Sequence, residues 1–265
     1  MKVSGNILKM KSTLVSPIKY ELPIGENLLH MNELIGKKIK LSFDGQINCI
    51  STGEKISKSY NQGFSFRASQ KLASCDICIV KPELCHFADG TCREPEWGKA
   101  NCFQPHIVYL SVSSHLKIGI TRESQVPTRW IDQGATYALP ILRVVDRLTS
   151  GLIEKEIAKS LSDKTNWRKM LQNDVDEIDL EEARENLFEE FADLLDDFDA
   201  EDLDEDVVQI DYPVNEYPTK IKSLGFDKNP EIEGVLNGIK GQYLILDCGV
   251  INMRKHQGYF ISIEY

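Results

Sequence analysis

The sequence of 265 residues predicts an α+β protein in which a central β-β-α-β-α unit carries a cysteine-rich knuckle. Strand-like apolar runs alternate with helix signals from residue 107 to residue 161, and five of the seven cysteines lie between residues 75 and 102. Both ends of the chain have β-type patterns. We therefore expect five segments: a β-rich N-terminal segment (1–74), a zinc knuckle (75–106), an α/β core (107–171), an acidic amphipathic helix (172–206) and a β-rich C-terminal segment (207–265).

The two terminal segments each contain a hairpin pattern. KKIKLSF (37–43) alternates like a strand, Asp44-Gly45 is a frequent hairpin turn, and QINCI (46–50) provides a returning strand. Near the other end, GQYLILDCGVINM and GYFISIEY flank RKHQG (254–258), which predicts a second hairpin.

Three strands are expected in the core. IVYLSV (107–112) is typical of a buried strand, SSH (113–115) forms a tight turn, and LKIGIT (116–121) is the second strand. The third is YALPILRVVD (137–146), in which Pro140 indicates a bulge or an edge position because proline cannot donate a ladder hydrogen bond.

Two helices complete the core. Pro127 fits the first turn of a helix that ends at Gly134, because proline has the helical φ and needs no amide partner there. Ser150 is a candidate N-cap for a second helix over 151–161. The order of elements is therefore β-β-α-β-α.

The segment 172–206 has 18 acidic residues and one base, Arg184. Apolar residues recur through it at helical spacing, which predicts one amphipathic helix docked by its apolar face. These residues are Leu180, Leu187, Phe188, Phe191, Leu194, Leu195 and Phe198.

Charge differs sharply between this segment and the rest of the chain. The whole chain has a formal net charge of −10, but without residues 172–206 it has 30 bases and 23 acids, a net of +7. A basic body attracts phosphates, and an acidic appendage repels them or recruits a protein partner. No run approaches the roughly 20 apolar residues of a membrane span, and the start lacks a secretory pattern, so we expect a cytoplasmic protein that does not enter membranes.

The cysteine cluster predicts a zinc site. Tetrahedral zinc takes four thiolates or imidazoles, and a closed set of four is structural rather than catalytic. A Cys-x2-Cys pair supplies two ligands from one turn, and clustering of this density argues against isolated buried thiols. The expected ligands are Cys75, Cys78, Cys92 and Cys102, with Cys85 and His86 as reserves.

A fainter pattern precedes the knuckle. Cys49-x2-Thr52 and Ser65-x2-Ala68 occupy positions where a zinc ribbon has two Cys-x2-Cys pairs. Three of these four residues lack sulfur, so zinc binding is not expected here.

The run from Cys75 to Ile141 resembles the family designated domain of unknown function 2797. The resemblance extends through DKTNWRKML (163–171) and GIKGQYLILDCGVINMRKH (238–256). Members of that family carry the ribbon cysteines, so this chain departs from the family there. The central part is similar to the GIY-YIG nuclease fold, which agrees with the β-β-α-β-α pattern.

The nuclease resemblance implies a set of catalytic positions. Tyr109 ends the first triplet (IVY), Lys117 begins the second (KIG), Arg129 lies on the first helix and Glu154 on the second. Glu154 would hold Mg²⁺ or Mn²⁺, and Arg129 would stabilise phosphoryl charge. Lys117 replaces a tyrosine, and Gln133 replaces a titratable residue, so the catalytic set is partial.

Three functions fit these patterns. The first is a zinc-containing, nucleic-acid-associated protein with metal-dependent phosphodiester cleavage. The second is a nucleic-acid-binding module without catalysis, and the third is a zinc-stapled scaffold that recruits a protein through the acidic helix. Metal-dependent cleavage separates the first from the second, and salt-sensitive binding of nucleic acid separates both from the third.

Overall fold

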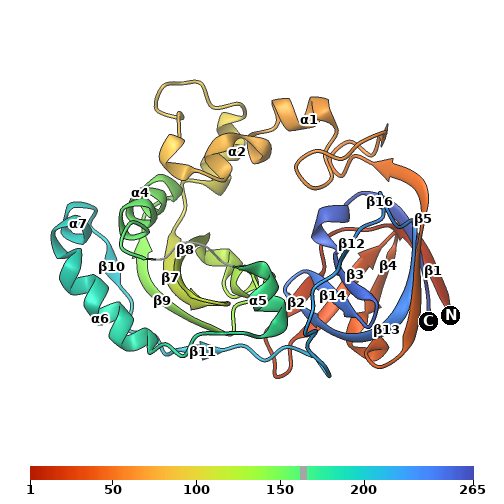
Figure 1. The fold of residues 1–265 in the computed structure, drawn as a ribbon. Coiled ribbons are helices and arrows are strands. Elements are labelled where there is room, and N and C mark those ends of the chain that lie inside the picture. Colours follow the sequence, from red (N-terminus) through yellow and green to blue (C-terminus); the bar gives the residue numbers. More distant parts are fainter. Residues whose placement is uncertain (162–165) are drawn as a thin grey trace. The chain divides into compact units, whose positions relative to one another are not determined.

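The computed structural model describes residues 1–161 and 166–265, which form two compact units (Figure 1). Unit 1 contains Met1–Gln70, Ile131–Gly134 and Asp211–Tyr265, and unit 2 contains Lys71–Trp130 and Ala135–Ile210. The first three residues of the DKTNWRKML motif lie outside the described residues. Both units combine strands with short helices, which confirms the α+β class.

Unit 1 is built on an eight-stranded sheet and a three-stranded sheet. In the larger sheet the strand order is β1-β16-β5-β13-β14-β15-β12, with β6 paired to β5. Its strands are β1 (Lys2–Asn6), β5 (Lys38–Asn48), β6 (Lys55–Ile56), β12 (Ser223–Leu224), β13 (Glu231–Lys240), β14 (Tyr243–Leu246), β15 (Gly249–Asn252) and β16 (Tyr259–Glu264). The smaller sheet has β2 (Lys11–Thr13), β3 (Lys19–Ile24) and β4 (Asn27–His30). The unit also has the 3-10 helices η1 (Met31–Leu34) and η6 (Arg254–His256), and α1 (Phe66–Lys71) begins within it.

The first predicted hairpin was wrong, because β5 continues through Asp44-Gly45 as a single strand. The register between β5 and β16 shifts between Tyr259 and Ile261, so the extra residues form a bulge. Gly45 has a φ of +88°, which glycine adopts without steric cost. Pairing with β16 on both sides of the bulge keeps the chain extended, and this partner is distant in sequence.

The second predicted hairpin was also wrong. RKHQG contains η6, and the strands on its two sides belong to different neighbours: β15 pairs with β14 and β12, whereas β16 pairs with β1 and β5. The hairpin in this region lies inside GQYLILDCGVINM, where β14 pairs with β15 from Tyr243↔Asn252 to Leu246↔Gly249.

Unit 2 has a five-stranded sheet in the order β10-β9-β7-β8, with β11 paired to β9. The strands are β7 (His106–Val112), β8 (Leu116–Arg122), β9 (Tyr137–Val144), β10 (Glu201–Asp202) and β11 (Val208–Gln209). The helices are α2 (Pro95–Asn101), α3 (Thr128–Asp132), α4 (Arg147–Ile157), α5 (Trp167–Gln172), α6 (Leu180–Glu190) and α7 (Ala192–Asp197), with the 3-10 helix η5 (Glu123–Gln125) between β8 and α3. The last two residues of α3 belong to unit 1. From β7 to α4 the order is β-β-α-β-α, apart from η5.

The second core helix begins earlier than predicted, and Ser150 does not cap it. Asp146 is the N-cap, and its carboxylate accepts a hydrogen bond from the Thr149 amide at 2.8 Å. Ser150 lies inside the helix, where its hydroxyl donates to the Arg147 carbonyl. Asp146 follows the end of β9 after one intervening residue and combines extended backbone with a capping oxygen, so the helix begins shortly after the strand.

Pro140 lies at a bulge, as expected. The register of β9 against β7 shifts between Val108 and Tyr109, opposite Leu142 and Pro140. The carbonyl of the intervening Ile141 accepts a hydrogen bond from the Leu203 amide at 3.0 Å. The bulge therefore keeps this strand in the sheet despite a missing amide donor.

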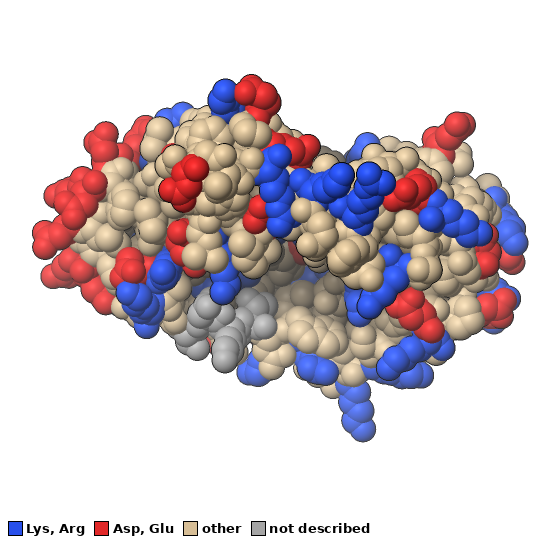
Figure 2. Space-filling model, turned by 90° about the horizontal axis from the view of Figure 1, so that it is seen from above, with Lys and Arg blue, Asp and Glu red and all other residues tan. Residues whose placement is uncertain are grey.

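The acidic segment is not one helix. It contains α6 and α7, which are separated at Phe191, and then β10, which pairs with β9. Asp179 caps α6 by accepting hydrogen bonds from the Glu181 and Glu182 amides. The prediction that the apolar side docks is confirmed, because Leu180, Leu187 and Leu195 belong to the core of unit 2. Acidic side chains gather over α6 and α7 in Figure 2. None of the described helices is both long and apolar enough to span a bilayer.

Candidate metal centre

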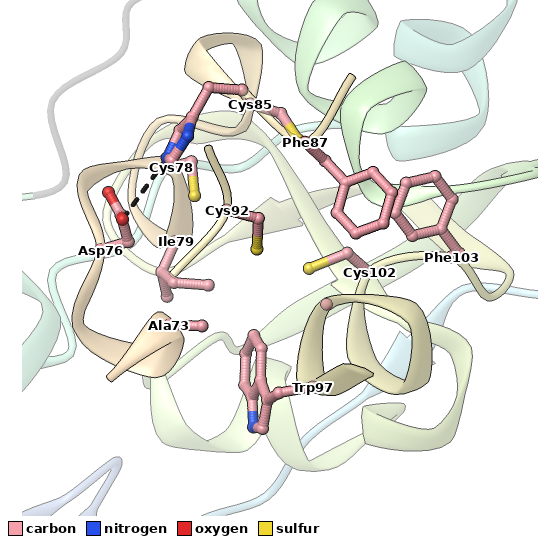
Figure 3. A pocket seen from close by; sticks show the side chains of 12 residues that line it. Ala73, Asp76, Cys78, Ile79, Cys85, Phe87, Cys92, Trp97, Cys102 and Phe103 are labelled. Carbon is pink, nitrogen blue, oxygen red and sulfur yellow. Dashed lines mark ion pairs between the residues drawn. The ribbon is translucent and has the colours of Figure 1, made fainter. Parts of the chain in front are cut away.

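Four thiols of the knuckle line one pocket in unit 2. They come from separate turns: Cys78 lies in the 3-10 helix η3 (Ile77–Ile79), Cys85 caps the end of η4 (Pro82–Leu84), Cys92 lies in a loop, and Cys102 caps the end of α2. In Figure 3 their sulfur atoms turn toward the same pocket. The chain therefore gathers four zinc-type donors from a stretch with little regular structure.

The pocket is small and largely apolar around the thiols. Its volume is about 20 Å³, and Phe87, Trp97 and Phe103 form part of its lining. The Phe87 and Phe103 rings pack with their centroids 4.6 Å apart. A space of this size accommodates one water-sized sphere, which is also the scale of a single metal ion.

Electrostatics disfavour thiolates in the metal-free pocket. Burial raises the pKa of the Cys78 thiol to about 11, and the Asp76 carboxylate and the thiols of Cys85 and Cys102 act in the same direction. Burial also raises the pKa of Cys102, and the Arg147 guanidinium opposes that rise. A divalent cation would reverse this balance, because metal binding stabilises the deprotonated thiols.

A second donor group shares Cys78. The ligand atoms of Asp76, Cys78 and His86 lie within 4.8 Å of one another and form a candidate metal-binding group. The Asp76 carboxylate is also paired with the Arg93 guanidinium at 2.6 Å. The His86 Nε2 lies 3.4 Å from the same Asp76 carboxylate. The other ring nitrogen of His86 is hydrogen-bonded to the Thr91 hydroxyl at 2.7 Å.

The predicted ligands are distributed unevenly around the pocket. Cys78, Cys92 and Cys102 line it, and so do both reserve ligands, Cys85 and His86. Cys75, at the end of the 3-10 helix η2 (Ala73–Cys75), is half-buried and is not one of the lining residues. Cys75 and Cys78 therefore lie in two consecutive turns rather than in a single ligand-bearing turn.

Arg147 connects the pocket to the core of unit 2. Its guanidinium donates to the Ile79 carbonyl, and its amide donates to the Cys102 carbonyl at 3.0 Å. A Cβ at Gly151, one turn further along α4, would overlap Pro82 in the knuckle. Arg147, at the start of α4, is thus hydrogen-bonded both to the segment of Ile79 and to that of Cys102, two residues that line the pocket.

Tyr109, the first residue that the nuclease resemblance selects, is completely buried in β7. Its ring packs against Trp130 with centroids 5.8 Å apart, and a Cβ at Gly119 would lie 2.7 Å from its hydroxyl. The register pairs Tyr109 with Gly119 and Ser111 with Lys117, so Tyr109 and Lys117 lie on the same face of the sheet.

The two predicted helix residues lie on different elements of unit 2. Arg129 is half-buried and precedes Trp130, which packs on the Tyr109 face. Glu154 is half-buried in α4, which packs by Ile153 and Ile157 into the hydrophobic core on the opposite face of the sheet. The helices that carry Arg129 and Glu154 thus cover opposite faces.

Arg129 belongs to a group of arginines that sequence reasoning missed. Burial lowers the pKa of Arg147, and the charges of Arg122 and Arg129 contribute to the lowering. Arg122 donates to the Asn101 side chain at 2.8 Å. The charges of these guanidinium groups repel one another, and a bound anion would relieve that repulsion. The signal was hard to find because the three arginines lie on three different elements.

The ribbon-like positions in unit 1 surround one thiol. The Cys49 sulfur accepts a hydrogen bond from the Ser65 amide at 3.2 Å and lies 3.3 Å from the Ser51 hydroxyl. Burial opposes ionisation, but hydrogen bonds from Ser51, Thr52 and Ser65 lower the pKa of Cys49 to about 6. Ser65 in turn accepts from the Ala68 amide, so hydrogen bonds hold this turn.

Comparison with known proteins gives one match. A search of curated proteins and a search of solved structures each found no similar protein. The model of a family described as "Protein of unknown function (DUF2797)" matches residues 36–261. Because this match covers most of the sequence, the chain belongs to the DUF2797 family.

Proposed function

We propose that the chain binds one zinc ion through the thiols of Cys78, Cys85, Cys92 and Cys102, and that the metal holds the knuckle in its folded form. The observation that supports this proposal is the convergence of four thiols on a pocket of about 20 Å³. Four thiolates at about 2.3 Å form a closed tetrahedral site, which leaves no open position for a reacting molecule. The proposed role of the metal is therefore structural.

We favour the four thiols over the group of Asp76, Cys78 and His86. Asp76 already has a close ion pair with Arg93 and accepts the Ile77 amide, so ligation would compete with both contacts. The four-thiol set needs no such exchange, and thiolate is a strong zinc ligand. In this assignment Asp76 and His86 line the pocket beside the ligands without binding the metal, as partners of metal ligands often do.

Metal analysis of matched variants tests the assignment. Protein purified without chelators should contain about one zinc per chain, and Cys75→Ser should retain it, because Cys75 lies outside the pocket lining. Cys85→Ser and Cys92→Ser should lose zinc and unfold at lower temperature, since structural metal binding is coupled to folding. Asp76→Asn should keep the metal.

Two results would contradict this assignment. Loss of zinc in Cys75→Ser with retention in Cys85→Ser would restore the ligand set that spacing alone favours. Loss of zinc in Asp76→Asn with retention in Cys92→Ser would identify the mixed group as the site.

A second candidate function is association with nucleic acid without cleavage. The arginine group of Arg122, Arg129 and Arg147 favours phosphate binding in unit 2. Cleavage is less well supported because Tyr109 is buried between Gly119 and Trp130, where its hydroxyl does not reach a phosphodiester. The helix of Glu154 also covers the other face of the sheet.

Binding and cleavage assays with one protein separate these alternatives. Arg129→Gln should weaken binding of a labelled oligonucleotide and lower the slope of log affinity against log salt by about 0.7 to 0.9 for one lost phosphate contact. Mg²⁺ or Mn²⁺ should produce no cleavage. Cleavage that Glu154→Gln abolishes would instead support the nuclease function, and unchanged binding in Arg129→Gln would remove the arginine group from the interface.

A further inference from the structure

We propose that unit 1 carries a binding surface for single-stranded nucleic acid, formed by the segment 55–70 and the turn η6. This proposal shares with the second candidate function above only the class of ligand, nucleic acid. The residues of the surface all belong to unit 1, whereas the arginine group belongs to unit 2. Three kinds of observation support it: a polar groove, a net positive charge in its lining and an exposed aromatic side chain beside the groove.

The groove has a volume of about 680 Å³, which is within the usual range for ligand sites. Lys58 lines one side and Lys255 of η6 lines the other. Hydrogen-bonding side chains complete much of the wall: Ser57, Ser59, Asn61 and Gln62. Ammonium, hydroxyl and amide groups are those that proteins use to contact nucleic-acid phosphates.

The acidic residue of the groove is already engaged. Asp227 accepts a hydrogen bond from the Tyr259 hydroxyl at 2.9 Å. The segment 55–70 contains three bases and no acid. Within the described residues, Lys58, Arg67 and Lys255 make no ion pair. The described lining of the groove has two ammonium groups, Lys58 and Lys255, and one carboxylate, Asp227, so its net charge is positive.

An aromatic platform lies next to these charges. Phe66 is 59% exposed, so much of its ring is open to solvent. Its ring contacts Tyr60 edge-on at 5.3 Å, and the Lys58 ammonium lies 5.4 Å from the Tyr60 ring centroid. An exposed aromatic ring beside a basic groove is an arrangement on which unpaired bases can stack while the nucleic-acid backbone follows the charges.

The turn that carries these groups is rigidly built. Asn61 and Gln62 have φ values of 43° and 63°, so the chain reverses tightly, and the Tyr60 amide donates to the Phe64 carbonyl at 2.9 Å. The Gln257 side chain donates to the Gln62 carbonyl at 3.0 Å and ties the turn to the segment after η6. The two sides of the groove are thus fixed to each other. Lys and Arg side chains gather over α1 and the preceding loop in Figure 2.

Single strands suit this surface better than duplex. A duplex presents its phosphates but keeps its bases stacked, so Phe66 has no free base face to contact. In a single strand the same surface can hold phosphates with Lys58 and Lys255 while a base stacks on Phe66. Binding should therefore be salt-sensitive, tolerant of sequence and selective for unpaired strands.

The test measures fluorescence anisotropy of a labelled single-stranded oligonucleotide with the zinc-loaded, full-length protein. Phe66→Leu keeps apolar volume but removes the ring, and it should weaken binding about five-fold or more, whereas Phe66→Tyr should bind normally. Lys58→Gln combined with Lys255→Gln should lower the salt slope by about 1.4, for two lost phosphate contacts. The matched control pair, Lys19→Gln with Lys220→Gln, removes two exposed lysines of unit 1 away from the groove.

The outcomes distinguish this surface from the arginine group of unit 2. Loss of affinity in the Phe66 and lysine variants, with little change in the control pair, supports the surface. Normal binding in those variants with weakened binding in Arg129→Gln overturns the surface and leaves the function proposed above intact. Equal loss in the control pair, tighter binding of duplex than of single strand, or no binding by the unaltered protein also overturns it.

Discussion

His106 shows how burial at one residue makes stability depend on pH. It begins β7 and is completely buried, and its Nδ1 lies 2.7 Å from the Gln104 carbonyl. Its Nε2 has no hydrogen-bond partner among the described residues. Burial lowers the pKa of His106 to about 4, although the Gln104 contact partly opposes the effect.

Acid should therefore destabilise the fold through His106. The unfolded chain takes up this proton near pH 6.5, whereas the folded chain takes it up only near pH 4. Stability from this residue is fully present above pH 6.5 and is lost as pH falls toward 4. We expect the free energy of unfolding of His106→Gln to fall less between pH 7.5 and pH 5 than that of the unaltered protein. Urea unfolding at each pH measures this difference.

The exposed His30 supplies the control for this measurement, because its side chain is 64% exposed. His30→Gln removes an imidazole that is paired with Glu21 at the surface, so it measures what the loss of an exposed histidine does to the pH dependence. An equal acid-induced loss in His106→Gln and the unaltered protein would show that His106 does not cause it. Zinc released at low pH affects all three proteins alike, so the differences between them report on the histidines.

The sequence indicated which type of residue would bind a metal, but it did not indicate which of the cysteines meet in one pocket. The density of cysteines in 75–102 indicates a metal site, but Cys-x2-Cys spacing pairs Cys75 with Cys78. In the fold these residues belong to η2 and η3, and Cys78 lies with Cys85 instead. Which thiols meet depends on how the turns dock against α4, and local spacing does not contain that information.

At the scale of elements, β7, β8 and β9 were predictable because each is a continuous apolar run between turn residues. Val108 and Leu110 in β7 are completely buried, together with Leu139 and Leu142 in β9. Such strands satisfy their backbone through immediate neighbours in the sequence, so local pattern is sufficient.

The elements that were predicted wrongly are those with distant partners. Asp44-Gly45 is a common hairpin turn, but β16 pairs across it and makes a bulge. The acidic segment has continuous helical spacing, but it breaks at Phe191, and β10 then adds to the edge of β9. In both cases the segment pairs with a strand from elsewhere in the chain, which its own sequence pattern does not indicate.

At the scale of the whole molecule, chain order and spatial order differ. β1 pairs with β16 over Lys2↔Glu264 to Asn6↔Phe260, so the two ends of the chain form neighbouring strands of one sheet. Four residues, Ile131–Gly134, also belong to unit 1 although the chain on both sides belongs to unit 2. A division of the sequence into consecutive segments has no means of representing this interleaving, because the pairing leaves no local signal.

The acidic segment reverses the sign of the charge of the whole molecule. The remainder of the chain has a net charge of +7, and the complete chain has −10. Docking of Leu187 and Leu195 in the core holds α6 and α7 in place, so their carboxylates form a fixed source of negative potential. A fixed negative field lowers the local concentration of any polyanion, and this effect extends over the Debye length.

Neutralising part of this field should strengthen the binding of nucleic acid at low salt. Asp193, Asp196, Asp197 and Asp199 are exposed, so replacing all four with asparagine removes charge while leaving the apolar side of α7 in place. The Debye length is about 30 Å at 0.01 M salt and about 8 Å at 0.15 M, so the gain in affinity should be large in the first buffer and small in the second. Anisotropy titrations of one oligonucleotide in both buffers measure this difference. Affinity that is equal in the two proteins at 0.01 M salt would show that the segment does not compete for phosphate, and would leave it as a solvated face or a surface for a protein partner.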